Sequence, residues 1–135
     1  MMERCRTVLV ACLIALSVAR PVWAGSYLDR AALLLTESNR ASHLLRARLG
    51  DKEFTRMVHD LMRARLEVGS HLLVPKEVTI AHPHLLMVLE NHERAAEAAE
   101  HSDHQNFLLH LQKATEEERI LRSIIEQHGW SFPSF

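Results

Sequence analysis

Residues 85–125 read LLMVLENHERAAEAAEHSDHQNFLLHLQKATEEERILRSII, and this stretch decides the fold class. It is dominated by leucine, alanine, glutamate and arginine, which favour helix. Apolar residues recur at helical spacing on either side of Ser102 and Gln105, which themselves have the spacing of a capping box. Pro83 suits the first turn of a helix before them, and Gly129 suits a left-handed cap after them. We therefore expect two helices joined by a short turn.

Two further helices are expected before this pair. Ser26 and Asp29 have capping-box spacing at the start of the first helix, and Asp51, directly after Gly50, is placed to cap the second. The second helix should stop before Pro75, because the residue preceding a proline avoids helical geometry. The apolar stripes expected to face the core are Leu28, Ala31, Leu35, Ser38, Ser42, Leu45 and Leu49 in the first helix, and Phe54, Met57, Val58, Leu61, Val68 and Leu72 in the second.

The connections between these four helices are short, which favours antiparallel neighbours. The longest connection, residues 73–81, contains Val74, Val78 and Ile80, which we expect to pack across one end of the molecule. The expected fold is therefore all-α, an up-and-down four-helix bundle formed by residues 25–135 as one domain.

Charge is divided between the two halves of this domain. Residues 25–75 carry a net charge of +2 and residues 76–135 carry −5, with histidine taken as neutral. These opposite charges favour packing of the first hairpin on the second, either within a monomer or between two extended chains of a homodimer. The basic residues are spread along both early helices rather than gathered in one patch, so nucleic acid is not expected as a partner.

The beginning of the chain, residues 1–24, has the order of a cleaved secretory signal peptide. Arg4 and Arg6 precede an apolar run over residues 8–19, and Val22 and Ala24 occupy the −3 and −1 positions of a cleavage site. The run is shorter than the roughly 20 residues of a membrane span, so no transmembrane span is expected in the mature chain. We expect an exported protein, periplasmic or secreted, and an uncleaved N-terminal anchor is the alternative.

Both cysteines lie inside this N-terminal segment. Cys12 follows residues that resemble a lipidation box, but most of the apolar run comes after it rather than before it. Cleavage after Ala24 would remove Cys5 and Cys12 together. The mature chain would then have no thiol, which excludes disulfides, zinc–thiolate sites, covalent haem attachment and cysteine nucleophiles.

Histidine is the unusual component, because all ten histidines lie in residues 25–135. The expected topology places His71, His82, His84 and His128 at one end of the bundle, with Glu67 one turn before His71. Imidazole and carboxylate groups suit Zn²⁺, Cu²⁺ or Ni²⁺, so these residues form a candidate metal site. The alternative is that they are exposed residues at helix ends, where a histidine interacts favourably with the helix dipole.

No catalytic motif is present. Neither a Glu-x-x-His pair nor His-Glu-x-x-His occurs in the sequence, so we expect no di-iron or zinc-hydrolase site and no enzyme. Four polar residues nevertheless fall on stripes assigned to the core, namely Ser38, Ser42, His92 and Glu118. Because buried polar groups need partners, these residues could form an internal network, but we expect instead a slight rotation of each helix that exposes the charged groups among them.

The C-terminal segment, residues 130–135, contains Trp130, Phe132 and Phe135. These aromatic residues either fold back over the end of the bundle or anchor a protein partner, since tryptophan is enriched at binding hot spots. The sequence as a whole favours a non-enzymatic protein that acts by binding, as a structural, adaptor or chaperone-like module without a cofactor. A protein that binds a transition metal through the histidine-rich end is the second hypothesis.

Overall fold

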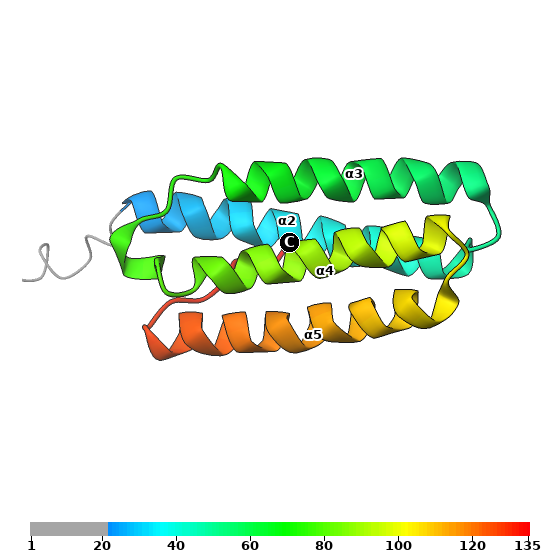
Figure 1. Ribbon diagram of the computed structural model, residues 1–135. Coiled ribbons are helices and arrows are strands. Elements are labelled where there is room, and N and C mark those ends of the chain that lie inside the picture. Colours follow the sequence, from blue (N-terminus) through cyan, green and yellow to red (C-terminus); the bar gives the residue numbers. More distant parts are fainter. Residues whose placement is uncertain (1–21) are drawn as a thin grey trace, which may run out of the picture.

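The structure, a computed structural model, describes residues 22–135, and within that range it contains four α-helices and no strand. The helices are α2 (Val22–Ala47), α3 (Lys52–Ser70), α4 (His82–Glu100) and α5 (His104–Gln127), with a 3-10 turn, η1 (Lys76–Val78), between α3 and α4. The chain reverses direction at each connection, so the helices lie side by side as a helical bundle (Figure 1).

None of the helices in the described range is long and apolar enough to cross a membrane.

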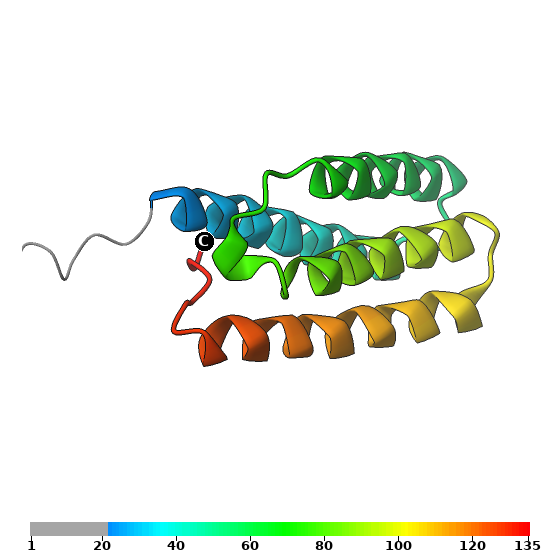
Figure 2. The same ribbon diagram turned by 60° about the vertical axis from the view of Figure 1, so that its left-hand side comes forward.

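Helix α4 is the central element of the bundle. Its backbone lies close to those of α2, α3 and α5, and α2 also lies close to α3. The connection formed by residues 71–81, the beginning of α2 and the end of α5 share one end of the molecule, here called the loop end (Figures 1 and 2). From there the C-terminal segment turns back along the bundle, and the C-terminus lies about halfway along its length (Figure 1).

Aspartate side chains cap the N-termini of two of the helices. Asp51 accepts a hydrogen bond from the Phe54 backbone N–H, as expected for a cap of α3. At α5 the predicted Ser102 cap is wrong, because Ser102 has a positive φ of 60° and lies before the helix. Asp103 is the N-cap there and accepts from the Asn106 N–H. The prediction for Gly129 is confirmed, since its φ is 76°.

The start of the first helix differs from the prediction. Helix α2 already includes Val22, so Ser26 and Asp29 lie on an exposed part of the helix rather than at its cap. The predicted cleavage position after Ala24 therefore falls in the first turn of α2. The rest of the predicted signal peptide, residues 1–21, lies outside the described residues.

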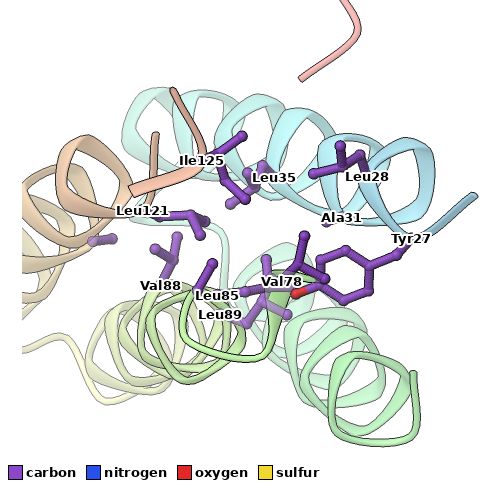
Figure 3. Close-up of a cluster of buried hydrophobic side chains, with 12 residues drawn as sticks. Tyr27, Leu28, Ala31, Leu35, Val78, Leu85, Val88, Leu89, Leu121 and Ile125 are labelled. Atoms are coloured by element: carbon purple, nitrogen blue, oxygen red, sulfur yellow. The ribbon is translucent and has the colours of Figure 1, made fainter. Parts of the chain in front are cut away.

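The core consists of two apolar clusters at different heights. The cluster at the loop end joins Leu35 of α2, Leu85 of α4 and Leu121 of α5 (Figure 3). The other cluster is centred on Phe107 and Met62. Between them lies a polar layer, defined here as Ser38, Ser42 and His92, and all three of its residues are buried. These three residues lie on the core-facing stripes that the spacing indicates, and the helices are not rotated to expose them.

Helix α3 presents a different face to the core than the sequence predicts. Leu61 and Val68 are exposed, as is Met57, although their spacing assigned them to the core. The buried residues of α3 are Thr55, Val58, His59, Met62 and Gly69. A Cβ added at Gly69 would lie 2.6 Å from Leu89 Cδ1, so the absence of a side chain allows α3 to approach α4 closely. Ile80 is also exposed, whereas Val78 is buried as expected.

Candidate functional site

The four histidines of the predicted metal site all lie at the loop end, but their rings have different partners. His71 Nδ1 donates to the Glu67 carbonyl oxygen over 2.8 Å, and His128 Nδ1 donates to the Ile124 carbonyl oxygen over 2.8 Å. Each ring is therefore hydrogen-bonded to the backbone of its own last helical turn. The part of Glu67 that meets His71 is the backbone rather than the carboxylate.

The other two histidines of this set bond to neighbouring helices. His82 Nδ1 lies 2.9 Å from the Tyr27 hydroxyl oxygen, and His84 Nδ1 lies 3.0 Å from Glu117 Oε2. Burial lowers the pKa of His82 and raises that of Tyr27. Within residues 22–135 no group of three His, Cys, Asp or Glu side chains is placed to hold a metal ion. The metal site gains no support from this geometry and stays a prediction.

An apolar pocket of about 360 Å³ opens at the same end of the molecule. Its volume lies within the range of roughly 300–1,000 Å³ that is usual for ligand pockets. The walls come from the start of α2 and from the chain after α3, and the lining residues are Ser26, Tyr27, Arg30, Leu72, Leu73, Val74, Pro75 and Glu77. Leu73 is 77% exposed, so a large apolar side chain stands uncovered at this pocket.

The aromatic C-terminal segment is folded back onto the bundle in part. Trp130 and Phe132 are partly buried and pack against the core cluster at the loop end, which confirms the fold-back prediction for these two residues. The Arg122 guanidinium lies 5.3 Å from the centre of the Phe132 ring and holds it against α5. Phe135 is exposed and contacts no core cluster in the described part of the chain.

A second group of polar residues joins α3 to α4 and was not singled out from the sequence. His59 is buried, and both of its ring nitrogens meet carboxylates: Nδ1 lies 2.6 Å from Glu100 Oε2, and Nε2 lies 2.8 Å from Glu93 Oε1. We call these three residues the His59 bridge. A ring that donates to two carboxylates must carry both hydrogens, which is the imidazolium form.

The pKa shifts in the His59 bridge agree with the imidazolium form of His59. Burial alone would lower the pKa of His59, but its hydrogen bonds to Glu100 and Glu93 outweigh burial and raise the pKa above its ordinary value. Arg63 opposes protonation, since its Nη2 lies 3.3 Å from Nε2. Arg56 pairs with Glu100 from the solvent side, and His59 lowers the pKa of that carboxyl. The bridge thus links the basic first half of the chain to the acidic second half.

The polar layer contains a third arrangement. Ser42 Oγ lies 2.8 Å from His92 Nδ1, while Nε2 of the same ring and Ser38 Oγ have no hydrogen-bond partner among the described residues. Burial is the main cause that lowers the pKa of His92 to about 4. Glu118, the fourth polar residue on the predicted core stripes, instead accepts hydrogen bonds from Asn39 and Arg122. Of the internal network considered from the sequence, the structure therefore contains the Ser42–His92 hydrogen bond alone.

Comparison with known proteins gives no further guide to these sites. The chain matches no family model, no curated protein and no solved structure.

Proposed function

We propose that this protein is an exported, non-enzymatic helical bundle that acts by binding, and that the apolar pocket at the loop end receives an apolar side chain of a protein partner. The observation that carries the proposal is the pocket itself, with Leu73 exposed beside it. In this proposal residues 25–135 form an up-and-down four-helix bundle that holds the pocket in place.

The lining of the pocket favours a peptide-like partner. The residues from Leu72 to Pro75 supply an apolar wall, while Arg30 and Glu77 add one positive and one negative charge, both exposed. A ligand with a long aliphatic chain and a single charge would pair with only one of these two charged residues. A peptide offers an apolar side chain for the wall and polar backbone groups for both charges.

Substituting Leu73 by aspartate tests the proposal. The probe is a short capped peptide with a single phenylalanine flanked by serine and glycine, titrated into the protein while the NMR signals of Tyr27 and Val74 are followed. Burying a leucine contributes about 1.5–3 kcal/mol, so we expect L73D to bind at least tenfold more weakly than the wild type. Folding should be unaffected, because Leu73 is already exposed.

The matched control for this experiment is Leu108→Asp. Leu108 is 53% exposed, and it lies at the beginning of α5, far along the chain from every residue of the pocket. It should leave peptide binding unchanged. The absence of any saturable signal change in the wild-type protein, or equal weakening by both substitutions, would contradict the proposal.

Export is the second part of the proposal and has its own test. It is supported by the charged, apolar and small-residue order of residues 1–24. Cleavage after Ala24 would remove three residues, Val22 to Ala24, from the start of α2 and leave Tyr27 and the pocket in place. N-terminal sequencing of the protein recovered outside the cytoplasm should therefore begin at Gly25. Recovery of only the full-length chain inside the cell would contradict export.

A further inference from the structure

An exposed aromatic side chain and an uncovered apolar pocket lie on the same molecule. Phe135 is 72% exposed, whereas Trp130 and Phe132 of the same segment pack against the core cluster at the loop end. The apolar pocket at that end is open along its apolar wall, where Leu73 is exposed. A molecule that carries both an exposed apolar group and a pocket to receive it can join to another copy of itself.

The size of the pocket suits one aromatic side chain. Its volume of about 360 Å³ equals that of roughly a dozen water molecules in the liquid. A phenylalanine side chain has only seven carbon atoms, so it fits and leaves space for the adjoining backbone. Because Tyr27 and the residues from Leu72 to Pro75 line the pocket, a phenylalanine ring would contact mainly carbon atoms there.

The backbone beside Phe135 can pair with the two charged residues of the pocket. In the described part of the chain, no backbone N–H of residues 131–135 donates to a backbone carbonyl oxygen. The Glu77 carboxylate can accept from such an N–H, and the Arg30 guanidinium can donate to a carbonyl oxygen of the same segment. Residues 131–135 have no charged side chain, so their binding would bury no additional charge.

The C-terminal segment is directed away from the pocket of its own chain. The Arg122 guanidinium lies 5.3 Å from the centre of the Phe132 ring, which anchors the segment on α5. From this anchor the segment turns back along the bundle, and the C-terminus lies about halfway along its length, whereas the pocket is at the loop end (Figure 1). While Phe132 stays docked, the occupant of the pocket has to come from another molecule.

We propose that Phe135 of one copy occupies the apolar pocket of a second copy, so that the chain is its own partner. This inference rests on the proposed function, because it uses the same pocket and names what fills it. Charge favours the pairing: the lining residues from Ser26 to Pro75 belong to the half with a net charge of +2, and Phe135 belongs to the half with −5. In a dimer with two-fold symmetry each copy supplies its Phe135 to the other.

Sedimentation equilibrium of the purified protein tests for self-association. Between about 10 μM and about 1 mM the average mass should rise from that of a monomer toward that of a dimer. Phe135→Ser and Leu73→Asp should each weaken association at least tenfold, since each removes one side of an apolar contact and changes an already exposed residue. Leu108→Ser, which removes an exposed apolar side chain from the beginning of α5, is the matched control and should associate like the wild type. A wild-type protein that stays monomeric, or equal weakening by all three substitutions, would overturn the inference.

A mixture of two variants locates the contact. F135S keeps the pocket and loses the occupant, whereas L73D keeps Phe135 and damages the pocket. Unlabelled L73D added to isotope-labelled F135S should therefore shift the NMR signals of Tyr27 and Val74 saturably, and unlabelled F135S should not. The capped phenylalanine peptide, added to the same labelled protein, keeps the two proposals apart. Shifts with the peptide but none with L73D would overturn self-association alone, whereas no shift with either would contradict the proposed function as well.

Discussion

Replacing His59 by alanine is expected to lower the free energy of unfolding by about 3 kcal/mol near pH 6, the largest effect of any single substitution considered. The cause is the pair of carboxylates that His59 separates. Without the imidazolium, Glu93 and Glu100, two turns apart on the same face of α4, are left as neighbouring negative charges with side chains only 17% and 25% exposed. Removing one partner of a buried ion pair costs about 3–5 kcal/mol, and this residual exposure places the expected loss at the lower limit.

A rescue variant separates charge from packing. Glu93→Gln and Glu100→Gln, combined with His59→Met, replace the charged bridge by neutral groups of similar volume. Such replacements are often close to neutral, so the triple variant should recover most of the stability lost in H59A. Urea unfolding of the three proteins measures both effects. If the triple variant is as unstable as H59A, the loss comes from packing and the assignment of the bridge is wrong.

The His59 bridge also has a defined dependence on pH. The pKa of His59 is raised in the folded protein above its ordinary value of 6.5. The His59 bridge therefore stabilises the folded protein fully at pH values below the ordinary pKa. This stabilisation is lost as the pH rises through the pKa of His59 in the folded protein, because the folded state keeps its proton at pH values where the unfolded chain has already released it. Deprotonation of His59 leaves one ring hydrogen for two carboxylates, which weakens the contact between α3 and α4.

The second large prediction concerns His92, whose pH dependence has the opposite sign. Its pKa falls from 6.5 to about 4 on folding, so the unfolded chain takes up a proton more readily than the folded protein. Stability should drop by about 3 kcal/mol as the pH decreases from about 6.5 to about 4, since one pKa unit corresponds to 1.36 kcal/mol. Urea unfolding at about pH 7 and about pH 4.5 measures this drop.

The substitution His92→Gln removes the titrating group and keeps an amide that can bond Ser42. We expect H92Q to lose less stability than the wild type between the two pH values, even if it is less stable at neutral pH. His104→Gln, at an exposed position of α5, controls for the loss of one imidazole. An acid-induced loss in H92Q equal to that of the wild type would show that other groups cause it. His82 and His110 are the first to examine, because burial lowers the pKa of each.

Periodicity predicted the helices well but could not choose the buried face of α3. This helix has apolar residues on two adjoining faces, one through Leu61 and Val68 and the other through Val58 and Met62. Hydrophobicity alone does not distinguish them. The choice depends on contacts with other helices, above all the His59 bridge and the close approach to α4 at Gly69. Those contacts exist only once α3 and α4 are paired.

The candidate sites could likewise be predicted only in part from the sequence. Topology correctly placed four histidines at the loop end, because the height of a residue in a bundle follows from its position along a helix. It did not show that His71 and His128 turn back to carbonyl groups of their own helices. The apolar pocket was missed for a related reason. Residues 72–75 read as packing residues, and only their path after α3 leaves a hollow beside Tyr27.

The start of α2, with Gly25, lies at the loop end beside the apolar pocket, and this position decides how the protein should be labelled. An affinity tag or surface linker added before Gly25 would crowd the apolar pocket, whose lining begins at Ser26. Gly50 lies in the turn between α2 and α3 at the opposite end, where an added Cβ meets nothing within 4 Å. Because both cysteines precede Gly25, Gly50→Cys would give a chain that begins at Gly25 a single thiol. A dye or bead coupled there would leave the loop end facing the solution.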